Sequence, residues 1–318
     1  MKIGIARILG NDLEEVHGKG QTVKNLKFTL ENENLGENVE YVYFLNRIVD
    51  KSQKYDIVAL LKKHNKKYVN IPFDIRKFRK MYGNFYLRLA YHNAILNYKK
   101  IDKYNYRKIA KTLMQYNLYL INNNGSRNYA LNYMKKNTDA EWLFILDSNS
   151  YFTRKDFDNI ISKIEKETEY LIIPTIKVDT FNLMQGEEYF YKLRGNYYGE
   201  GSIAFHKNSK LNFNERIPYG ASPKAELLRV MDVTDSWEEW IDNENVHIMM
   251  EWNKWIDNVK TYNIPDRKKV KVKWQILPKI LRLSTYNSNN NMKNNQINRV
   301  KGIICLIRKI LSKKNIII

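Results

Sequence analysis

Residues 122–157 read NNNGSRNYALNYMKKNTDAEWLFILDSNSYFTRKDF, and this stretch decides the fold. A polar turn over residues 122–125 leads into a helical pattern, which is followed by an apolar run over residues 142–146. A short apolar run between polar segments is typical of a buried strand. Because Asp147 follows the run directly, the sequence predicts a strand that carries an aspartate at its carboxyl end.

The same alternation of short apolar runs and helical patterns extends in both directions from this stretch. Strands are expected over residues 3–9, 41–45, 67–73, 118–121, 142–146, 170–173 and 202–205. Helices are expected over residues 21–30, 55–64, 126–136, 223–231 and 237–257, and over most of 75–116. Strands that alternate with helices are typical of βαβ units, so the pattern predicts an α/β fold with a mostly parallel sheet.

Polar residues follow several of the expected strands at the point where each strand ends. These clusters are Asn11-Asp12, Asn46-Arg47, residues 122–128 and residues 147–149. In open parallel sheets, ligands bind outside the carboxyl ends of the strands. The clusters are therefore expected to lie around one binding site.

The segment around Arg127 has the features of a phosphate site. Gly125 can adopt a positive φ angle, and Ser126 is a suitable N-cap for the helix that follows. Arg127 and Asn128 would then lie in the first turn, where a guanidinium and free backbone N–H groups can bind phosphate oxygens together. Asp147, at the end of the next strand, could hold a divalent cation that bridges these phosphates.

These motifs also carry a family resemblance. The series Gly-Ser-Arg-Asn-Tyr-Ala-Leu, followed by Glu-Trp-Leu-Phe-Ile-Leu-Asp-Ser-Asn, resembles the GT-A fold glycosyltransferases and is similar to their family-2 type, which builds bacterial surface polysaccharides. The segment GSIAFHKNSKLNFNERIPYGASPKAELL (201–228) is similar to the acceptor-side part of that family. The resemblance covers about residues 1–250 and implies a GT-A-like, Rossmann-like sheet flanked by helices.

The resemblance also implies roles for particular residues. Arg127 and Asn128 match the pair that supports the nucleotide diphosphate, and Asp147 matches the first Asp of the Asp-x-Asp motif, near the ribose and the metal. Asn149 stands where the last Asp, the usual metal ligand, is expected. An amide oxygen can bind Mg²⁺ or Mn²⁺ but brings no charge, so the predicted metal site at Asp147 and Asn149 is a weak one.

The remaining candidates are less well defined. Inverting transfer needs a carboxylate that accepts the proton of the acceptor hydroxyl, and the nearest matches are Glu226 in PKAELL and Glu200 in YYGEGSIAF. Either could instead be an ordinary solvated residue, Glu226 on a helix and Glu200 in a turn. Asp12 and Arg47 follow the first two strands, where the family contacts the base and the ribose.

Composition limits the possible compartments and partners. The single cysteine, Cys305, excludes an internal disulfide and fits a reducing compartment. The N-terminus does not resemble a signal peptide, and no run is long enough to span a membrane, so a cytoplasmic protein is expected. The formal net charge is +20, but 14 of the 54 Lys and Arg lie after Asp266, which leaves 40 basic against 34 acidic residues before that point.

The sequence thus predicts a catalytic domain over residues 1–266 and a basic amphipathic tail over residues 267–318. Residues 273–283 and 298–312 both have apolar positions at helical spacing with Lys and Arg between them, and residues 284–298 are expected to be a connector. Basic amphipathic helices bind anionic membrane surfaces, which predicts a peripheral location on the inner face of the cytoplasmic membrane. The alternative is a helix docked on the catalytic domain.

Together these features predict a nucleotide-sugar-dependent glycosyltransferase that extends a surface glycan such as a capsule or lipopolysaccharide, with a glycan or lipid-linked acceptor. Inversion and an Mn²⁺ or Mg²⁺ cofactor are implied by the resemblance. A nucleotidyl- or phosphotransferase that uses the same phosphate site remains an alternative. A nucleic-acid-binding protein is disfavoured because the excess charge lies in the tail, whose apolar residues are mainly aliphatic rather than base-stacking.

Overall fold

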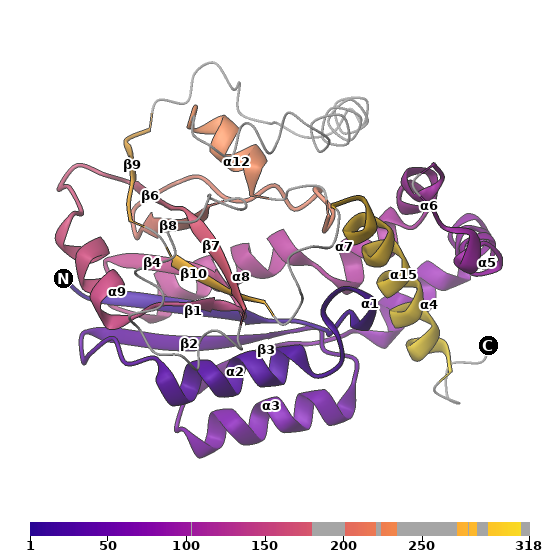
Figure 1. Cartoon of the computed structure of the whole chain (residues 1–318), viewed down its shortest axis with the longest axis horizontal. Helices are drawn as coiled ribbons and strands as arrows, with labels where there is room; N and C mark the ends of the chain where they lie inside the picture. Colours follow the sequence, from indigo (N-terminus) through magenta and orange to yellow (C-terminus); the bar gives the residue numbers. More distant parts are fainter. Residues whose placement is uncertain are drawn as a thin grey trace.

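The computed structural model describes residues 1–102, 104–179, 201–220, 224–233, 272–278, 280–284 and 292–312. Within these residues the chain forms a central sheet with helices on both faces and a group of helices at one end (Figure 1). The helix predicted over residues 237–257 lies outside the described residues.

The central sheet has the strand order β3-β2-β1-β4-β8-β6-β9. Strands β1, β2, β3 and β4 run parallel to one another, whereas β8 runs antiparallel to both β4 and β6. The order 3-2-1-4 is that of a doubly wound α/β sheet. The predicted α/β fold, with a mostly parallel sheet flanked by helices, is confirmed. The bounds are β1 (Ile3–Leu9), β2 (Val39–Asn46), β3 (Lys67–Ile71), β4 (Trp142–Asp147), β6 (Tyr170–Ile173), β8 (Ser202–His206) and β9 (Trp274–Ile276).

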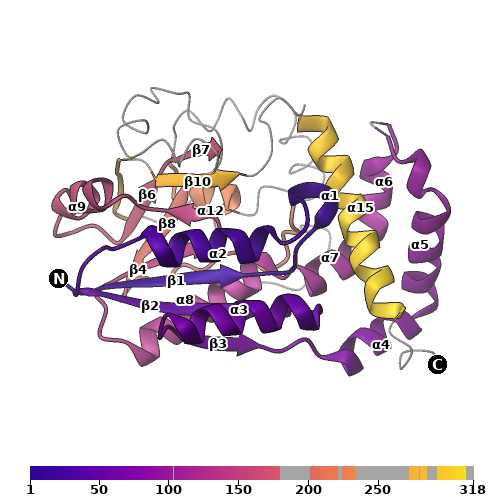
Figure 2. The same ribbon diagram turned by 60° about the horizontal axis from the view of Figure 1, so that its bottom comes forward.

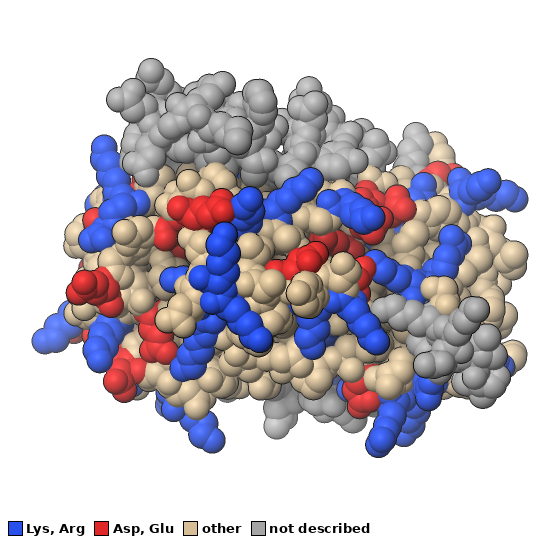
Figure 3. All heavy atoms as spheres, turned by 90° about the horizontal axis from the view of Figure 1, so that it is seen from below, with Lys and Arg blue, Asp and Glu red and all other residues tan. Residues whose placement is uncertain are grey.

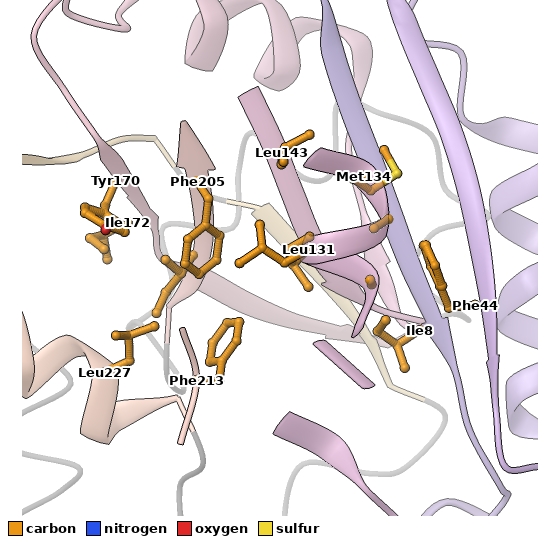
Figure 4. Close-up of a cluster of buried hydrophobic side chains, with 14 of the residues drawn as sticks. Ile8, Phe44, Leu131, Met134, Leu143, Tyr170, Ile172, Phe205, Phe213 and Leu227 are labelled. Carbon is orange, nitrogen blue, oxygen red and sulfur yellow. The ribbon is translucent and has the colours of Figure 1, made fainter. Parts of the chain in front are cut away.

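Helices cover the two faces of this sheet. Helices α2 (Gln21–Asn32) and α3 (Lys51–Lys63) lie along one face (Figure 1), and α8 (Asn123–Asn137) packs on the other against β1, β2 and β4. Leu131 and Met134 of α8 belong to the same buried cluster as Leu143 and Phe205 of the sheet (Figure 4). This packing fixes α8 relative to the carboxyl end of β4. Helices α9 (Arg154–Ser162) and α12 (Ala225–Val230) follow later in the chain.

A buried ion pair lies on the opposite face of β1 from α8. The Nη2 atom of Arg7 is 2.6 Å from both carboxylate oxygens of Glu33, and both side chains are only 1% exposed. Arg7 also donates to the carbonyl oxygen of Ser150, and Glu33 accepts from the backbone N–H of Phe152 at 2.9 Å. The pair therefore ties β1 and the end of α2 to the segment that directly follows the strand ending at Asp147.

That segment starts a second sheet, with the order β5-β10-β7. Its strands are β5 (Ser150–Tyr151), β7 (Thr175–Asp179) and β10 (Ile280–Ser284). The amphipathic helix predicted over residues 273–283 is therefore wrong: β9 pairs with β6, and β10 pairs with β5 and β7. Pro278 provides the physical reason, since proline inside a helix removes a backbone hydrogen bond and clashes with the preceding turn.

The group of helices at one end of the molecule contains α1 (Glu14–His17), α4 (Ile75–Gly83), α5 (Phe85–Leu96), the 3₁₀ turn η1 (Tyr98–Lys100), α6 (Tyr106–Thr112), α7 (Met114–Leu120) and α15 (Met292–Leu311). We call it the helical layer. The strand predicted over residues 118–121 is wrong, because these residues end α7 and continue beyond it. The buried residues here follow a helical spacing of i, i+3, i+4 and i+7: Leu113, Tyr116, Asn117 and Leu120. This spacing is longer than the four-residue apolar run over 118–121, so that run alone did not reveal it.

Helix α15 lies across the helical layer, beside α1, α5, α6 and α7 (Figure 2). It begins at Met292, so the connector predicted over residues 284–298 is wrong for its second half. The apolar face predicted to meet a membrane is covered by the protein itself, with Ile303, Ile304, Ile307 and Ile310 all buried in the core of the helical layer. None of the described helices is long and apolar enough to cross a membrane.

The cations of α15 are also engaged within the protein. Lys309 forms an ion pair with Asp50, and the charged groups of Lys301 and Arg308 lie 5.7 Å and 5.6 Å from the centre of the Tyr98 ring. The cations of this docked helix thus have partners within the protein. The structure instead has the docked arrangement that the sequence left as the alternative.

Candidate active site

Strand β4 ends at Asp147, as predicted, and two cations meet its carboxylate. The Nη2 atom of Arg127 lies 2.8 Å from Oδ1 of Asp147, and Nζ of Lys224 lies 3.3 Å from Oδ2. Arg127 and Lys224 are 3% and 4% exposed, whereas Asp147 is 24% exposed. The predicted proximity of Arg127 and Asp147 is confirmed, and the carboxylate is the part of the cluster that reaches solvent.

The start of α8 explains how Arg127 reaches Asp147. The helix begins at Asn123, and it is Asn122, with φ of 47°, that has the left-handed conformation. Asn adopts this conformation more readily than most residues. The turn predicted at Gly125 and the N-cap predicted at Ser126 are therefore wrong; Oγ of Ser126 donates to the carbonyl of Asn123 inside the helix. Arg127 thus lies in the second turn and acts through its side chain.

Gly125 leaves room for a neighbouring side chain, which is a different role from the predicted turn. A Cβ atom there would lie 2.2 Å from Oδ1 of Asn122 and 3.4 Å from Oε2 of Glu215. The absence of a side chain lets Asn122 fold over the first turn of α8, where its Nδ2 donates to Oδ1 of Asn46.

Arg127 is held on its other side as well. Its Nη1 donates to Oδ1 of Asn124 at 2.8 Å, and its guanidinium lies 5.6 Å from the centre of the Phe213 ring. Its buried Nε has no hydrogen-bond partner among the residues that the structure describes. The guanidinium is thus fixed in place before any ligand binds.

Asn128 joins α8 to the segment that carries Phe213 and Glu215. Its Nδ2 donates to the carbonyl of Phe213 and to Oε1 of Glu215, both at 2.9 Å, and its Oδ1 accepts from the N–H of Phe213 at 2.9 Å. The side chain of Asn128 therefore positions residues 213–215. Its contact with a diphosphate stays a prediction.

The two candidates that follow β1 and β2 have separate surroundings. Asp12 accepts from the N–H of Thr22 at 3.0 Å and so caps the start of α2. Arg47 donates to the carbonyl of Tyr119 at 2.6 Å. Burial lowers the pKa of Arg47, while the charges of Tyr119 and Glu215 oppose that shift. Arg47 interacts electrostatically with Glu215, which in turn bonds to Asn128 near the start of α8. The carboxylate of Asp12 instead caps α2.

Of the two predicted general bases, the structure describes one. Glu226 lies in the first turn of α12, two residues after Lys224, and is 4% exposed. Glu200 lies outside the described residues.

The charges around Asp147 do not balance. Burial by itself would raise the pKa of Asp147, but the positive charges of Arg127, Lys224 and Arg282 outweigh burial and hold the pKa well below its usual range. Arg282 is half-buried on β10, opposite Ser150 in the strand register. Among the described residues, these three cations outnumber the carboxylate that they surround, so the cluster of these four groups has a net positive charge. Such a cluster attracts anions.

The same charges argue against the predicted metal site. Mg²⁺ and Mn²⁺ prefer oxygen ligands, usually including carboxylates, but both oxygens of Asp147 face cations. Asn149 donates its Nδ2 to the carbonyl of Leu283 at 3.2 Å, which ties it to β10. Over the described ranges no group of three or more His, Cys, Asp or Glu residues could hold a metal ion. The residues at this position do not fit a divalent cation.

Sequence reasoning missed Lys224 and Arg282 as members of this cluster, and it missed Glu215 as a partner of Asn128. Lys224 and Glu215 lie within the segment used for the resemblance, but their spacing to Asp147 gives no local signal. Arg282 was expected on a helix, where it would not have reached the sheet.

No protein-family model and no curated protein matches this sequence. Among solved structures, the chain is similar to S. aureus TarS residues 1–349 (13% identity, 83% of this chain and 74% of that chain, TM-score 0.37). It is also similar to the mannosyltransferase PcManGT from Pyrobaculum calidifontis in complex with GDP-Man and Mn²⁺ (10%, 91% and 58%, 0.35) and to mouse xyloside xylosyltransferase 1 (11%, 87% and 85%, 0.30). We assign the fold from the strand order and not from these similarities, because the TM-scores are low.

Proposed function

We propose that this protein is a nucleotide-sugar-dependent glycosyltransferase. The observation that carries the proposal is the positive cluster of Arg127, Lys224 and Arg282 around Asp147, at the carboxyl end of a central strand. This is the edge at which open α/β sheets bind their ligands. The resemblance of residues 122–149 to family-2 glycosyltransferases supports the same function.

A nucleoside diphosphate is the leaving group that suits this cluster. In direct displacement, the acceptor hydroxyl oxygen attacks the anomeric carbon while the bond from that carbon to the diphosphate oxygen breaks. Negative charge then develops on the diphosphate, and fixed cations stabilise it most in the transition state. Arg127 is fixed by Asn124 and Asp147, so it needs little reorganisation to act in this way.

The acceptor proton must go to a carboxylate as the new bond forms. We assign this role to Glu226, because it starts α12 close to Lys224, which itself contacts Asp147. Glu200 remains a candidate from the sequence. Displacement in a single step inverts the anomeric configuration.

The cations of the chain replace a metal ion in this proposal. A divalent cation at Asp147 and Asn149 would have to displace Arg127 and Lys224 from the carboxylate. Transfer is therefore expected to proceed in the presence of a chelator. The proposed acceptor is a growing surface glycan of the capsule or lipopolysaccharide type, a proposal that rests on the sequence resemblance.

The test is calorimetric binding of UDP-, GDP-, CMP- and TDP-sugars to the full chain, with EDTA or with Mn²⁺. One donor family is expected to bind equally in both conditions. Lys224→Met is expected to weaken binding roughly 10- to 100-fold, the value of a hydrogen bond to a charged group. Lys27→Met, which removes an exposed lysine of α2, is the matched control and should change nothing.

Product analysis completes the test. Release of a nucleoside diphosphate from the nucleotide-sugar on addition of a glycan acceptor supports sugar transfer. Release of pyrophosphate from a nucleoside triphosphate on addition of a sugar phosphate supports the nucleotidyltransferase alternative. Failure of all four donor families to bind in both conditions would refute the proposed function. Binding that requires Mn²⁺ would refute only the metal-free site.

A further inference from the structure

Helix α5 is apolar on the face that points away from the protein. Phe85, Leu89 and Leu96 are all exposed, Phe85 by 61% and Leu96 by 77%. Their spacing of i, i+4 and i+11 places them along one side of the helix. Tyr91 and Ala94 are buried on the opposite side, in the core of the helical layer. Exposed polar residues of the same helix, Arg88, His92 and Asn93, accompany these apolar side chains. The outer side of α5 therefore combines large exposed apolar groups with polar ones.

We call this outer side the α5 face and define it by Phe85, Tyr86, Leu89 and Leu96. Tyr86 is exposed next to Phe85, and the two rings pack edge to face. Single exposed apolar residues are ordinary on protein surfaces, whereas a continuous apolar patch marks an interaction site.

The charge around the α5 face is strongly one-sided. Between residues 75 and 121 there are 11 Lys and Arg and one acidic residue, Asp102; the basic residues are Arg76, Lys77, Arg79, Lys80, Arg88, Lys99, Lys100, Lys103, Arg107, Lys108 and Lys111. The face over α2 and α3 differs, since acidic and basic residues are interspersed there (Figure 3). The segment of the chain that contains α5 thus carries a large positive excess.

We propose that the α5 face binds an anionic lipid surface. Phe85, Tyr86, Leu89 and Leu96 would enter the boundary between headgroups and acyl chains, while the neighbouring Lys and Arg would contact the headgroups. Apolar residues on one side of a helix with cations around them are the features of interfacial binding, and each Lys or Arg near an anionic surface adds to the attraction.

The positive charge near the α5 face, together with its apolar residues, favours an anionic lipid surface over the other possible partners. Two copies of this face would bring like charges together, which opposes self-association. A nucleic acid would be attracted by the charge, but phosphate contacts make no use of exposed leucines. A lipid surface with anionic headgroups satisfies both the apolar and the cationic residues.

The α5 face lies on the same side of the molecule as the candidate active site. The helical layer lies beyond the carboxyl ends of β1, β2 and β3 (Figure 2), which is the edge that carries the candidate active site. A membrane bound at α5 would therefore lie on the side of the molecule toward which that edge opens. The inference stands on the α5 face alone and does not depend on the proposed reaction.

Vesicle flotation of the full chain tests the proposal. Binding to vesicles of phosphatidylglycerol and phosphatidylethanolamine is expected, with much weaker binding to phosphatidylcholine and a decrease at high salt. The triple variant Phe85→Ser, Leu89→Ser, Leu96→Ser should lose at least about 10-fold in binding, since it removes the inserted apolar groups. The triple variant should keep its fold because all three side chains are exposed. Circular dichroism checks this.

Two controls make the result specific. Tyr55→Ser removes an equally exposed aromatic side chain from α3 and should leave flotation unchanged. Arg88→Ser, Lys99→Ser, Lys100→Ser keeps the apolar groups and should reduce binding to anionic vesicles only. Equal flotation of the wild-type protein and the apolar triple variant would overturn the proposal. A dimer in solution that the triple variant abolishes would also overturn it, and would assign the face to a second copy.

Discussion

Two arginine–carboxylate clusters lie at opposite faces of the central sheet, and they differ in charge balance and in access to solvent. Arg7 and Glu33 form a matched pair in which both side chains are 1% exposed. Around Asp147, by contrast, Arg127, Lys224 and Arg282 exceed the one carboxylate, which remains 24% exposed. A sealed and balanced pair organises the fold, whereas an open cluster with excess charge is suited to a ligand of the opposite sign.

Breaking the sealed pair should have the largest effect on stability. Glu33→Gln leaves the buried guanidinium of Arg7 without its counter-charge, which typically costs about 3–5 kcal/mol in the free energy of unfolding. Urea denaturation would measure this. The double variant Arg7→Met, Glu33→Leu should recover most of the loss, because both charges are then gone. A loss below about 1 kcal/mol for Glu33→Gln would contradict the structural role of the pair.

Breaking the open cluster should instead affect binding. Arg127→Met removes the fixed guanidinium and is expected to weaken nucleoside diphosphate binding by about 1.5–3 kcal/mol, measured by calorimetry. Arg7→Met serves as the comparison, provided that the protein remains folded at the temperature of the experiment. Similar losses of binding in the two variants would show that the clusters are not functionally distinct.

The pH dependence of stability sharpens the comparison further. The folded-state pKa of Asp147 is depressed by its cations, so its ionised form stabilises the fold above the unfolded pKa of about 3.9. The difference in unfolding free energy between wild type and Asp147→Asn should be constant from about pH 5 to 8 and shrink as the pH falls below about 4. A difference that grows on acidification would mean that the pKa is raised instead.

The smallest effect is expected for an ion pair on the surface. Nζ of Lys2 lies 3.5 Å from the Asp139 carboxylate, with side chains 67% and 88% exposed. Lys2→Met should change the unfolding free energy by less than about 1 kcal/mol, because solvent screens such pairs. A larger change would indicate that exposure is a poor guide to the value of ion pairs in this protein.

The sequence was sufficient for those parts of the fold that depend on local pattern. The apolar run that ends at Asp147 and the position of Arg127 twenty residues earlier predicted their meeting, because successive parallel strands and their helices have a regular geometry. Short apolar runs misled where helical and strand periodicity overlap, as they did over residues 118–121 and 273–283.

The rest of the cluster depends on contacts between distant parts of the chain. Lys224 reaches Asp147 across the fold, and Arg282 does so only because β10 pairs with β5. The sequence of an amphipathic helix likewise does not identify the surface against which the helix packs. The spacing of Ile303, Ile304 and Ile307 identified an apolar face on α15 but could not tell a membrane from the helical layer.

The docking of α15 also affects how the protein is made. Sγ of Cys305 lies 3.6 Å from Oε1 of Glu15, across 290 positions of the chain. At about 5–20 residues per second, a ribosome needs roughly 15 to 60 seconds to synthesise that interval. During this time the nascent helical layer lacks Ile304 and Ile307 and exposes the side chains that they later cover. The layer therefore closes only after α15 has been synthesised.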